Sequence, residues 1–180
     1  IAVVGEAIRH DLQLSDLQLG MLGGLAFSLF YAALGIPLAR LAERYSRVRI
    51  IAAVTVLWSF MTALSGAAGS YLQLLLCRMG VGVGEAGFTP ALVSMISDRF
   101  DPARRAVVFS LIALGVPLGG AIAAIGGGAI AQHFGWRLAL LAVGAPGLLL
   151  ALLLFLTIPE PVRTDAGDRE DTPPFGAVLR

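Results

Sequence analysis

Four long runs of uncharged, mostly apolar residues restrict this chain to a membrane fold. They cover residues 17–39, 50–77, 106–132 and 138–159. Each run reaches the roughly 20 residues that a helix needs to cross the hydrocarbon core of a bilayer. Charged residues make up 14% of the chain, well below the about 25% that is typical of soluble domains. The chain is therefore predicted to be an all-α polytopic membrane protein with the lipid bilayer as a partner.

Local signals divide these runs into helices. Residues 15–18 (SDLQ) fit a capping box that starts a helix near Asp16, and residues 66–70 (GAAGS) mark a tight turn inside the second run. The resulting interpretation has three parts, namely the end of transmembrane helix 1 in residues 1–10, transmembrane helices 2–6 in residues 16–158, and a cytoplasmic central loop leading to helix 7 in residues 159–180. The chain is thus expected to be an internal piece of a larger protein.

Arginine is distributed unevenly between the predicted loops. Residues 40–49 hold four arginines, residues 98–105 three and the segment after Pro159 another three, whereas the opposite side has only Arg9 and Arg137. Positive-inside bias places the three arginine-rich segments in the cytoplasm. All 13 Lys+Arg positions are arginine and the chain lacks asparagine, which suggests a GC-rich, bacterial genome. We therefore expect a multi-pass protein of the cell inner (plasma) membrane.

Arg78 and Glu85 are the only charges between residues 50 and 97. Seven helical positions correspond to a rotation of about 700° and a rise of ~10 Å, so both lie on one face but too far apart for a salt bridge. Intramembrane charges usually serve ions or substrate. Glu85 is therefore a candidate proton site, and Arg78 a candidate for binding an anionic group or tuning Glu85. The alternatives are that Arg78 snorkels to an interface and that Glu85 only holds helices together.

Small residues accompany the two charges and recur in the next span. Alternating glycines between the charges are expected to expose backbone and leave room for a bound group. The next span is also rich in small residues, and such a density is expected where a span bends and packs against its neighbours. The helix bending and packing residues are Gly80, Gly82 and Gly84 in the first span and Gly115, Pro117, Gly119 and Gly120 in the second.

Other classes of function find little support in the sequence. The single cysteine, Cys77, excludes an internal disulfide and a cysteine metal cluster, and His10 and His133 show no metal-ligand spacing. No basic run interleaved with aromatic residues indicates nucleic-acid binding, and no nucleophile–base pair supports an enzyme. We therefore expect no catalytic residue, no metal and no cofactor. A non-transporting membrane subunit stays open as an alternative.

Residues 39–49 (ARLAERYSRVR) resemble the cytoplasmic signature between helices two and three of the major facilitator superfamily, typically G-x-x-x-D-R-x-G-R-R/K. Three residues fall on its acidic and basic positions: Glu43, Arg44 and Arg47. The segment departs from the signature at four positions: Ala39, Glu43, Ser46 and Val48. The alternative is that the arginines of this segment serve merely as a positive-inside signal.

Two further segments resemble spinster-like members of that superfamily. Residues 78–87 (RMGVGVGEAG) are similar to their helix-four segment, and residues 134–137 (FGWR) to the stretch before helix six. Residues 115–120 (GVPLGG) are similar to the helix-five motif of proton antiporters, with Val116 where a glycine would precede the proline.

The resemblance implies the amino-terminal six-helix half of a major facilitator fold, with helix one truncated. It further implies a proton-coupled secondary active transporter that moves an amphipathic or lipid-like organic solute by alternating access. Its partners would be this solute, protons and the second half of the transporter, and Glu43, Arg44 and Arg47 would form a gating loop. The alternative within transport is a drug or organic-acid carrier of the same superfamily.

Overall fold

The computed structural model describes residues 3–159 and is helical throughout them apart from short connections. The elements in order are α1 (Gly5–Leu12), α2 (Asp16–Gly20), the π-helical segment η1 (Met21–Leu25), α3 (Ala26–Arg44), α4 (Arg47–Ser65), α5 (Tyr71–Arg99), α6 (Pro102–Ile122), the π-helical segment η2 (Ala123–Gly127), α7 (Gly128–Phe134) and α8 (Trp136–Thr157). Among these described residues, five stretches are long and apolar enough to cross a membrane: Asp16–Ala42, Arg47–Ser65, Tyr71–Arg99, Pro102–Phe134 and Trp136–Thr157. The predicted cytoplasmic loop at residues 159–180 lies, apart from Pro159, outside the described residues.

Serine caps start α2 and α5 where the sequence predicts them. The Ser15 hydroxyl accepts a hydrogen bond from the Gln18 amide at 3.2 Å, and the Gln18 side chain accepts one from the Ser15 amide at 2.9 Å. Each bond satisfies a backbone donor that the first turn of a helix leaves unpaired. Ser70 caps α5 in the same way, accepting from the Gln73 amide at 3.4 Å. The predicted capping box and the predicted turn at residues 66–70 are both confirmed.

The extents predicted for the two arginine-rich loops are wrong. Helix α3 continues to Arg44 and α4 begins at Arg47, so that only two residues connect them, and α5 and α6 are also joined by two residues. Ser46 starts α4 early because its hydroxyl accepts from the Arg49 amide at 3.2 Å. Polar residues therefore occupy helix ends here, where long charged side chains reach the interface without ending the helix.

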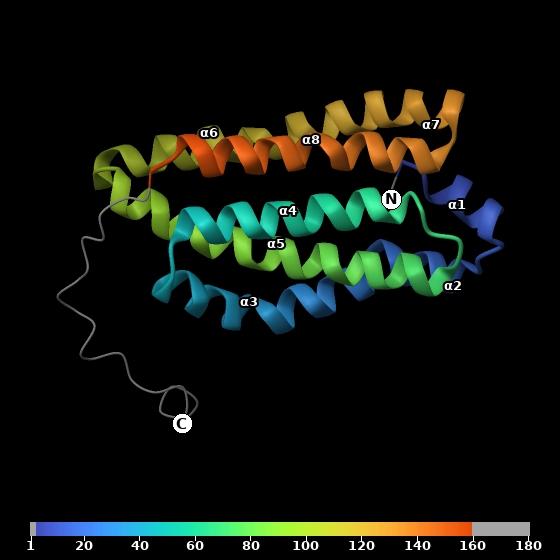
Figure 1. The fold of residues 1–180 in the computed structure, drawn as a ribbon, viewed down its shortest axis with the longest axis horizontal. Helices are drawn as coiled ribbons and strands as arrows, with labels where there is room; N and C mark the ends of the chain where they lie inside the picture. Colours follow the sequence, from blue (N-terminus) through green and yellow to red (C-terminus); the bar gives the residue numbers. More distant parts are fainter. Residues whose placement is uncertain (1–2, 160–180) are drawn as a thin grey trace.

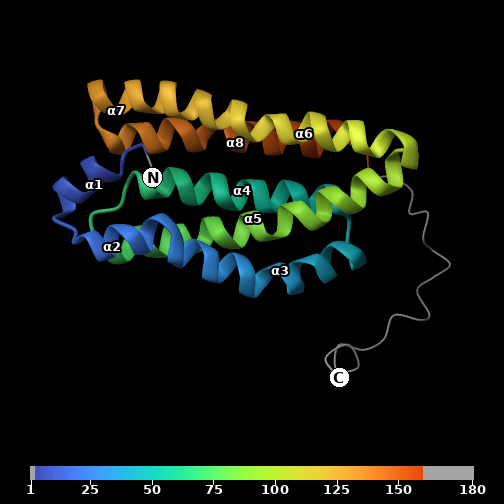
Figure 2. The same cartoon turned by 180° about the vertical axis from the view of Figure 1, so that it is seen from behind.

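The helices form a bundle in which α4 and α5 are central (Figure 1). Helix α4 packs against α5 and α8, and α5 also packs against α3. The α6–η2–α7 span is continuous (Figure 2), and its η2 and α7 parts pack against α8. Helix α6 is described completely and contains no buried residue. Two faces of the bundle, those of α3 and α6, are thus the least covered by the rest of the chain.

Gly135 makes the sharp connection between α7 and α8. Its φ of 85° lies in the left-handed region that side chains with a Cβ avoid. Because of this backbone conformation, α8 begins directly at Trp136 and turns back along α7 (Figures 1 and 2).

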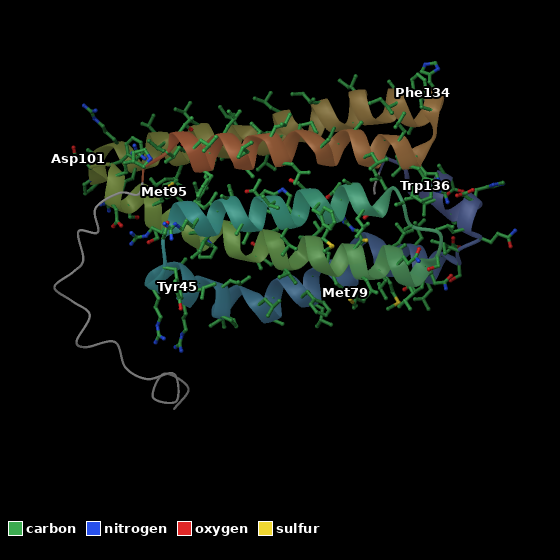
Figure 3. The ribbon with its side chains drawn as sticks, in the orientation of Figure 1. Tyr45, Met79, Met95, Asp101, Phe134 and Trp136 are labelled. Atoms are coloured by element: carbon green, nitrogen blue, oxygen red, sulfur yellow. The ribbon has the colours of Figure 1, made fainter. Side chains whose placement is uncertain are left out.

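The two ends of the bundle offer positions for testing its orientation. Tyr45 and Asp101 lie at one end, and Phe134 and Trp136 at the other (Figure 3). Because of the arginine bias, cysteines at Tyr45 and Pro102 are expected to react with an impermeant thiol reagent only from the cytoplasm, and one at His133 only from outside. Arg47, which is only 5% exposed, is unsuitable for labelling.

The labelling is best done on the full-length protein after its native cysteines, including the buried Cys77, have been replaced by alanine. Labelling of the Tyr45 and Pro102 positions from outside, with His133 protected, would show the reverse orientation.

Candidate functional site

Arg78 is anchored to the neighbouring span at its π-helical turn. Its Nε donates to the Leu22 carbonyl at 3.2 Å, and its guanidinium carbon lies 5.9 Å from the centre of the Phe27 ring. Leu22 belongs to η1, and a π turn interrupts the regular i→i−4 pairing, which leaves a carbonyl available to an outside donor. The partner of Arg78 is therefore a backbone group of another helix, and no carboxylate among the described residues pairs with it.

Arg78 also lines a small cavity of about 120 Å³. The hydroxyls of Thr62 and Ser65 lie on the same wall and donate to carbonyls of their own helix at 2.7 and 2.8 Å. These hydroxyls keep lone pairs but have no further proton to donate. The remaining lining is apolar: Val3, Val4, Ala123, Gly127, Ala139, Leu140 and Val143.

Glu85 opens into a different and larger cavity. This cavity has a volume of about 820 Å³ and lies between α3, α4, α5 and α6. Glu85 is exposed although Gly84 and Ala86 on either side are buried. It is the only charged residue among the described residues that line the cavity, and it makes no hydrogen bond or ion pair with any of the described residues. The structure thus places Arg78 and Glu85 on one helix, as expected, but not in one cavity.

Four aromatic side chains from four helices line the Glu85 cavity: Tyr31, Trp58, Phe88 and Phe109. The rings of Trp58 and Phe88 meet edge to face, with centroids 5.2 Å apart and an interplanar angle of 68°. The sequence analysis missed all four because nothing in a linear pattern brings them together. One signal was available, since tryptophan and tyrosine concentrate at the ends of spans whereas Tyr31 and Trp58 lie well inside theirs.

The glycines between Arg78 and Glu85 lie at close helix contacts. A Cβ on Gly80 would lie 2.7 Å from Met61 Cγ, one on Gly82 would lie 2.8 Å from the Phe27 carbonyl oxygen, and one on Gly84 would lie 3.0 Å from Trp58 Cβ. Helices α3 and α4 therefore fill the space in which we expected room for a bound group. Small residues at these positions let α5 approach both helices closely.

The small residues of α6 are placed differently. A Cβ on Gly115, Gly119 or Gly120 would meet no described atom within 4 Å, and Pro117 lies inside the helix. Gly119 lines the Glu85 cavity. The described part of the chain therefore offers no packing partner for this face of α6.

Arg47 forms a buried ion pair at the end of the bundle where α3 meets α4. Its Nη1 lies 2.6 Å from the Asp98 Oδ2, and the two side chains are 6% and 4% exposed. Its Nε donates to the Ser94 hydroxyl at 2.7 Å. Arg47 thus ties the start of α4 to the end of α5. Arg44 is exposed at the end of α3, and the side chain of Glu43 lies outside the described part of the structure.

Asp98 is a residue that the sequence analysis missed, because it was assigned to a loop. It lies in the last turn of α5, where the helix dipole disfavours a negative charge. An acid at such a position indicates a nearby cation, and this signal could have identified it as a partner for the arginine-rich segment.

Asp11 connects three segments at the opposite end of the bundle. Its Oδ2 accepts from Arg137 Nη1 at 2.5 Å and from Trp136 Nε1 at 3.2 Å. The Arg137 guanidinium also lies over the Trp136 ring, 4.3 Å from its centre, and donates to the Ala68 carbonyl at 3.5 Å. These contacts tie α1 to the start of α8 and to the turn between α4 and α5.

The Asp11 contact is expected to weaken in acid. The hydrogen bond from Arg137, aided by that from Trp136, holds the pKa of Asp11 below its ordinary value of 3.8, although partial desolvation opposes this. The lowered pKa of Asp11 stabilises the folded state fully at pH values above the ordinary pKa of 3.8. This stabilisation is lost as the pH falls through the pKa that Asp11 has in the folded state. The melting temperature of wild-type full-length protein should exceed that of Asp11→Asn near neutral pH, and the gap should close on acidification. A gap that does not change with pH would contradict this assignment.

Comparison with known proteins extends these observations. Residues 1–180 match the family model described as Major Facilitator Superfamily. An MFS-type efflux pump of Mycolicibacterium smegmatis is 39% identical over 178 residues, which cover 99% of this chain and 40% of that protein. Protein spinster homolog 1 of Homo sapiens is 31% identical over 148 residues, which cover 81% of this chain and 28% of that protein.

A solved structure shows the same fold. It is the crystal structure of a bacterial homolog of the human lysosomal transporter Spinster in an inward-facing, occupied conformation. The match has a TM-score of 0.78 and 39% sequence identity, and it covers 91% of this chain and 41% of that chain. The predicted resemblance and the predicted fold class, an amino-terminal half of an all-helical transporter fold, are confirmed. The chain belongs to the Major Facilitator Superfamily of membrane transporters.

Proposed function

We propose that the full-length protein is a proton-coupled secondary active transporter that moves an amphipathic or lipid-like organic solute across the plasma membrane. The observation that carries this proposal is the position of Glu85. Its carboxylate faces a cavity of about 820 Å³ between membrane-spanning helices and has no ion pair among the described residues. A carboxylate with no fixed partner can exchange its proton as the cavity opens to either side of the membrane.

Arg78 has a supporting role in this proposal. It is the nearest cation to Glu85 along α5. The anchorage of Arg78 to Leu22 and Phe27 uses one of its donors, and the rest of the guanidinium is available to an anionic group or to a change in pairing during transport. We therefore assign Arg78 to anion binding or coupling.

Glu43, Arg44 and Arg47 are proposed to form a latch for the gate on the cytoplasmic side. Support comes from the buried contact of Arg47 with Asp98, which joins helices that have to shift if the cavity changes its access. The second half of the transporter is the proposed partner of the bare faces of α3 and α6. Substrate sites of such transporters lie between repeats near the bilayer midplane.

A drug or organic-acid carrier is the second candidate function. The similarity to an efflux pump over 99% of this chain favours it. Both candidates are transporters of this superfamily and differ in the solute that is moved.

The proposal is tested by reconstituting the full-length protein in liposomes with an imposed pH gradient and a mixture of metabolites and drug-like solutes. At least one organic solute should accumulate, as measured by mass spectrometry, and a protonophore should abolish its accumulation. Glu6→Gln, which removes an exposed acid remote from the cavity, is the matched control and should transport normally. Accumulation that resists the protonophore would contradict proton coupling, and absence of any flux would contradict transport.

A further inference from the structure

The Glu85 cavity combines one negative charge with an aromatic lining. Tyr31, Trp58, Phe88 and Phe109 line it together with Glu85. No arginine, lysine or histidine is among the described residues of its wall. The nearest arginine along α5, Arg78, opens into the separate smaller cavity. Among the described residues, the one charge that lines the larger cavity is therefore a carboxylate, and four aromatic side chains line the cavity with it.

Both features attract the same kind of ligand. The face of an aromatic ring carries negative partial charge and attracts a cation within about 6 Å of its centre. A carboxylate adds a full charge, and its attraction is stronger in an apolar site than in water. An anion would be repelled by the carboxylate and would gain nothing from the ring faces.

We infer that the Glu85 cavity binds hydrophobic organic cations, such as amphipathic ammonium or phosphonium compounds. This inference rests on the proposed function and specifies the substrate class for that site. The volume of about 820 Å³ lies within the ~300–1,000 Å³ of typical ligand pockets. Apolar side chains are available to hold the body of such a ligand: Leu92, Val93, Ile112, Ala113 and Val116.

Two ions of nearly identical shape and opposite charge provide the test. Tetraphenylphosphonium and tetraphenylborate are titrated into purified full-length protein in detergent micelles, and the saturable binding above that of empty micelles is measured by calorimetry. The cation is expected to bind at least about tenfold more tightly than the anion, a ratio that corresponds to about 1.4 kcal/mol. Equal affinities, or tighter binding of tetraphenylborate, would overturn the inference.

Variants localise the binding to this cavity. Glu85→Gln should weaken tetraphenylphosphonium binding about tenfold or more, whereas Glu85→Asp should retain most of it. Phe88→Leu should weaken it about 3- to 30-fold, the range of a cation–π contact. The matched control Phe134→Leu, at an exposed ring at the far end of the bundle, should leave it unchanged. Unchanged affinity in both Glu85→Gln and Phe88→Leu would overturn the inference.

The test does not depend on the folding of a single variant. Should Glu85→Gln fail to fold, the cation-to-anion ratio of the wild type and the Phe88→Leu variant still decide the outcome. If the cation inference is right but the proposed transport function is wrong, the protein will bind the cation selectively and show no proton-driven flux. Proton-driven flux of a solute without preference for tetraphenylphosphonium would overturn the cation inference alone.

Discussion

Glu85→Gln is expected to abolish accumulation of substrate driven by a pH gradient. Glutamine has nearly the shape of glutamic acid but cannot bind and release a proton, so the variant separates coupling from packing. Binding of substrate, and its exchange across the membrane without a gradient, should persist in part because the cavity and its aromatic lining are unchanged. The measurement is uptake by the full-length protein in liposomes with and without an imposed gradient.

Two matched variants make this result specific. Glu85→Asp keeps an ionisable carboxylate and should retain gradient-driven uptake, whereas Glu6→Gln removes an exposed acid of α1 and should behave as wild type. If Glu85→Gln accumulates substrate at the wild-type rate, then Glu85 only holds the structure together and coupling resides in other residues of the full-length protein.

Breaking the Arg47–Asp98 pair should have the largest effect on stability. The two side chains are 6% and 4% exposed and lie 2.6 Å apart. Removing one partner of a buried ion pair typically costs about 3–5 kcal/mol of the free energy of unfolding. Arg47→Met and Asp98→Asn should each show such a loss, measured by denaturant titration of the full-length protein in micelles.

The double variant Arg47→Met/Asp98→Leu separates the charge from the packing. It should recover much of the loss, because replacing a buried ion pair by apolar residues is often neutral. As a control, Arg9→Met removes the exposed contacts with Glu6 and Asp16 and should change stability little. Single variants at Arg47 and Asp98 that are as mild as Arg9→Met would show that the pair is not effectively buried.

The features that the sequence predicted correctly are local ones. The start of α2 follows from Ser15 and Gln18, which are three residues apart and hydrogen-bond to each other. The turn before α5 likewise follows from a short run of glycine and serine. The spans themselves follow from length and composition. These signals lie within a single segment, so no knowledge of the packing is needed.

The features that the sequence analysis missed depend on packing between helices. Arg47 pairs with an acid at the end of α5, and Asp11 with an arginine at the start of α8. The four rings around Glu85 come from four different helices. Hydropathy gives no register between helices, so a single sequence does not show which side chains meet. The loop extents were wrong for a related reason, since polarity marks the interface and not the last helical residue.

The contact between Asp11 and Arg137 also sets an order of events during synthesis. The two residues are 126 positions apart, and at about 5–20 residues per second the ribosome needs roughly 6–25 s to make the chain between them. Asp11 therefore stays without this arginine while the intervening spans enter the membrane. The arrival of α8 adds this tie to the contacts that α1 already makes with α2 through Arg9 and Asp16, so this end of the bundle completes its contacts only after α8 has been inserted.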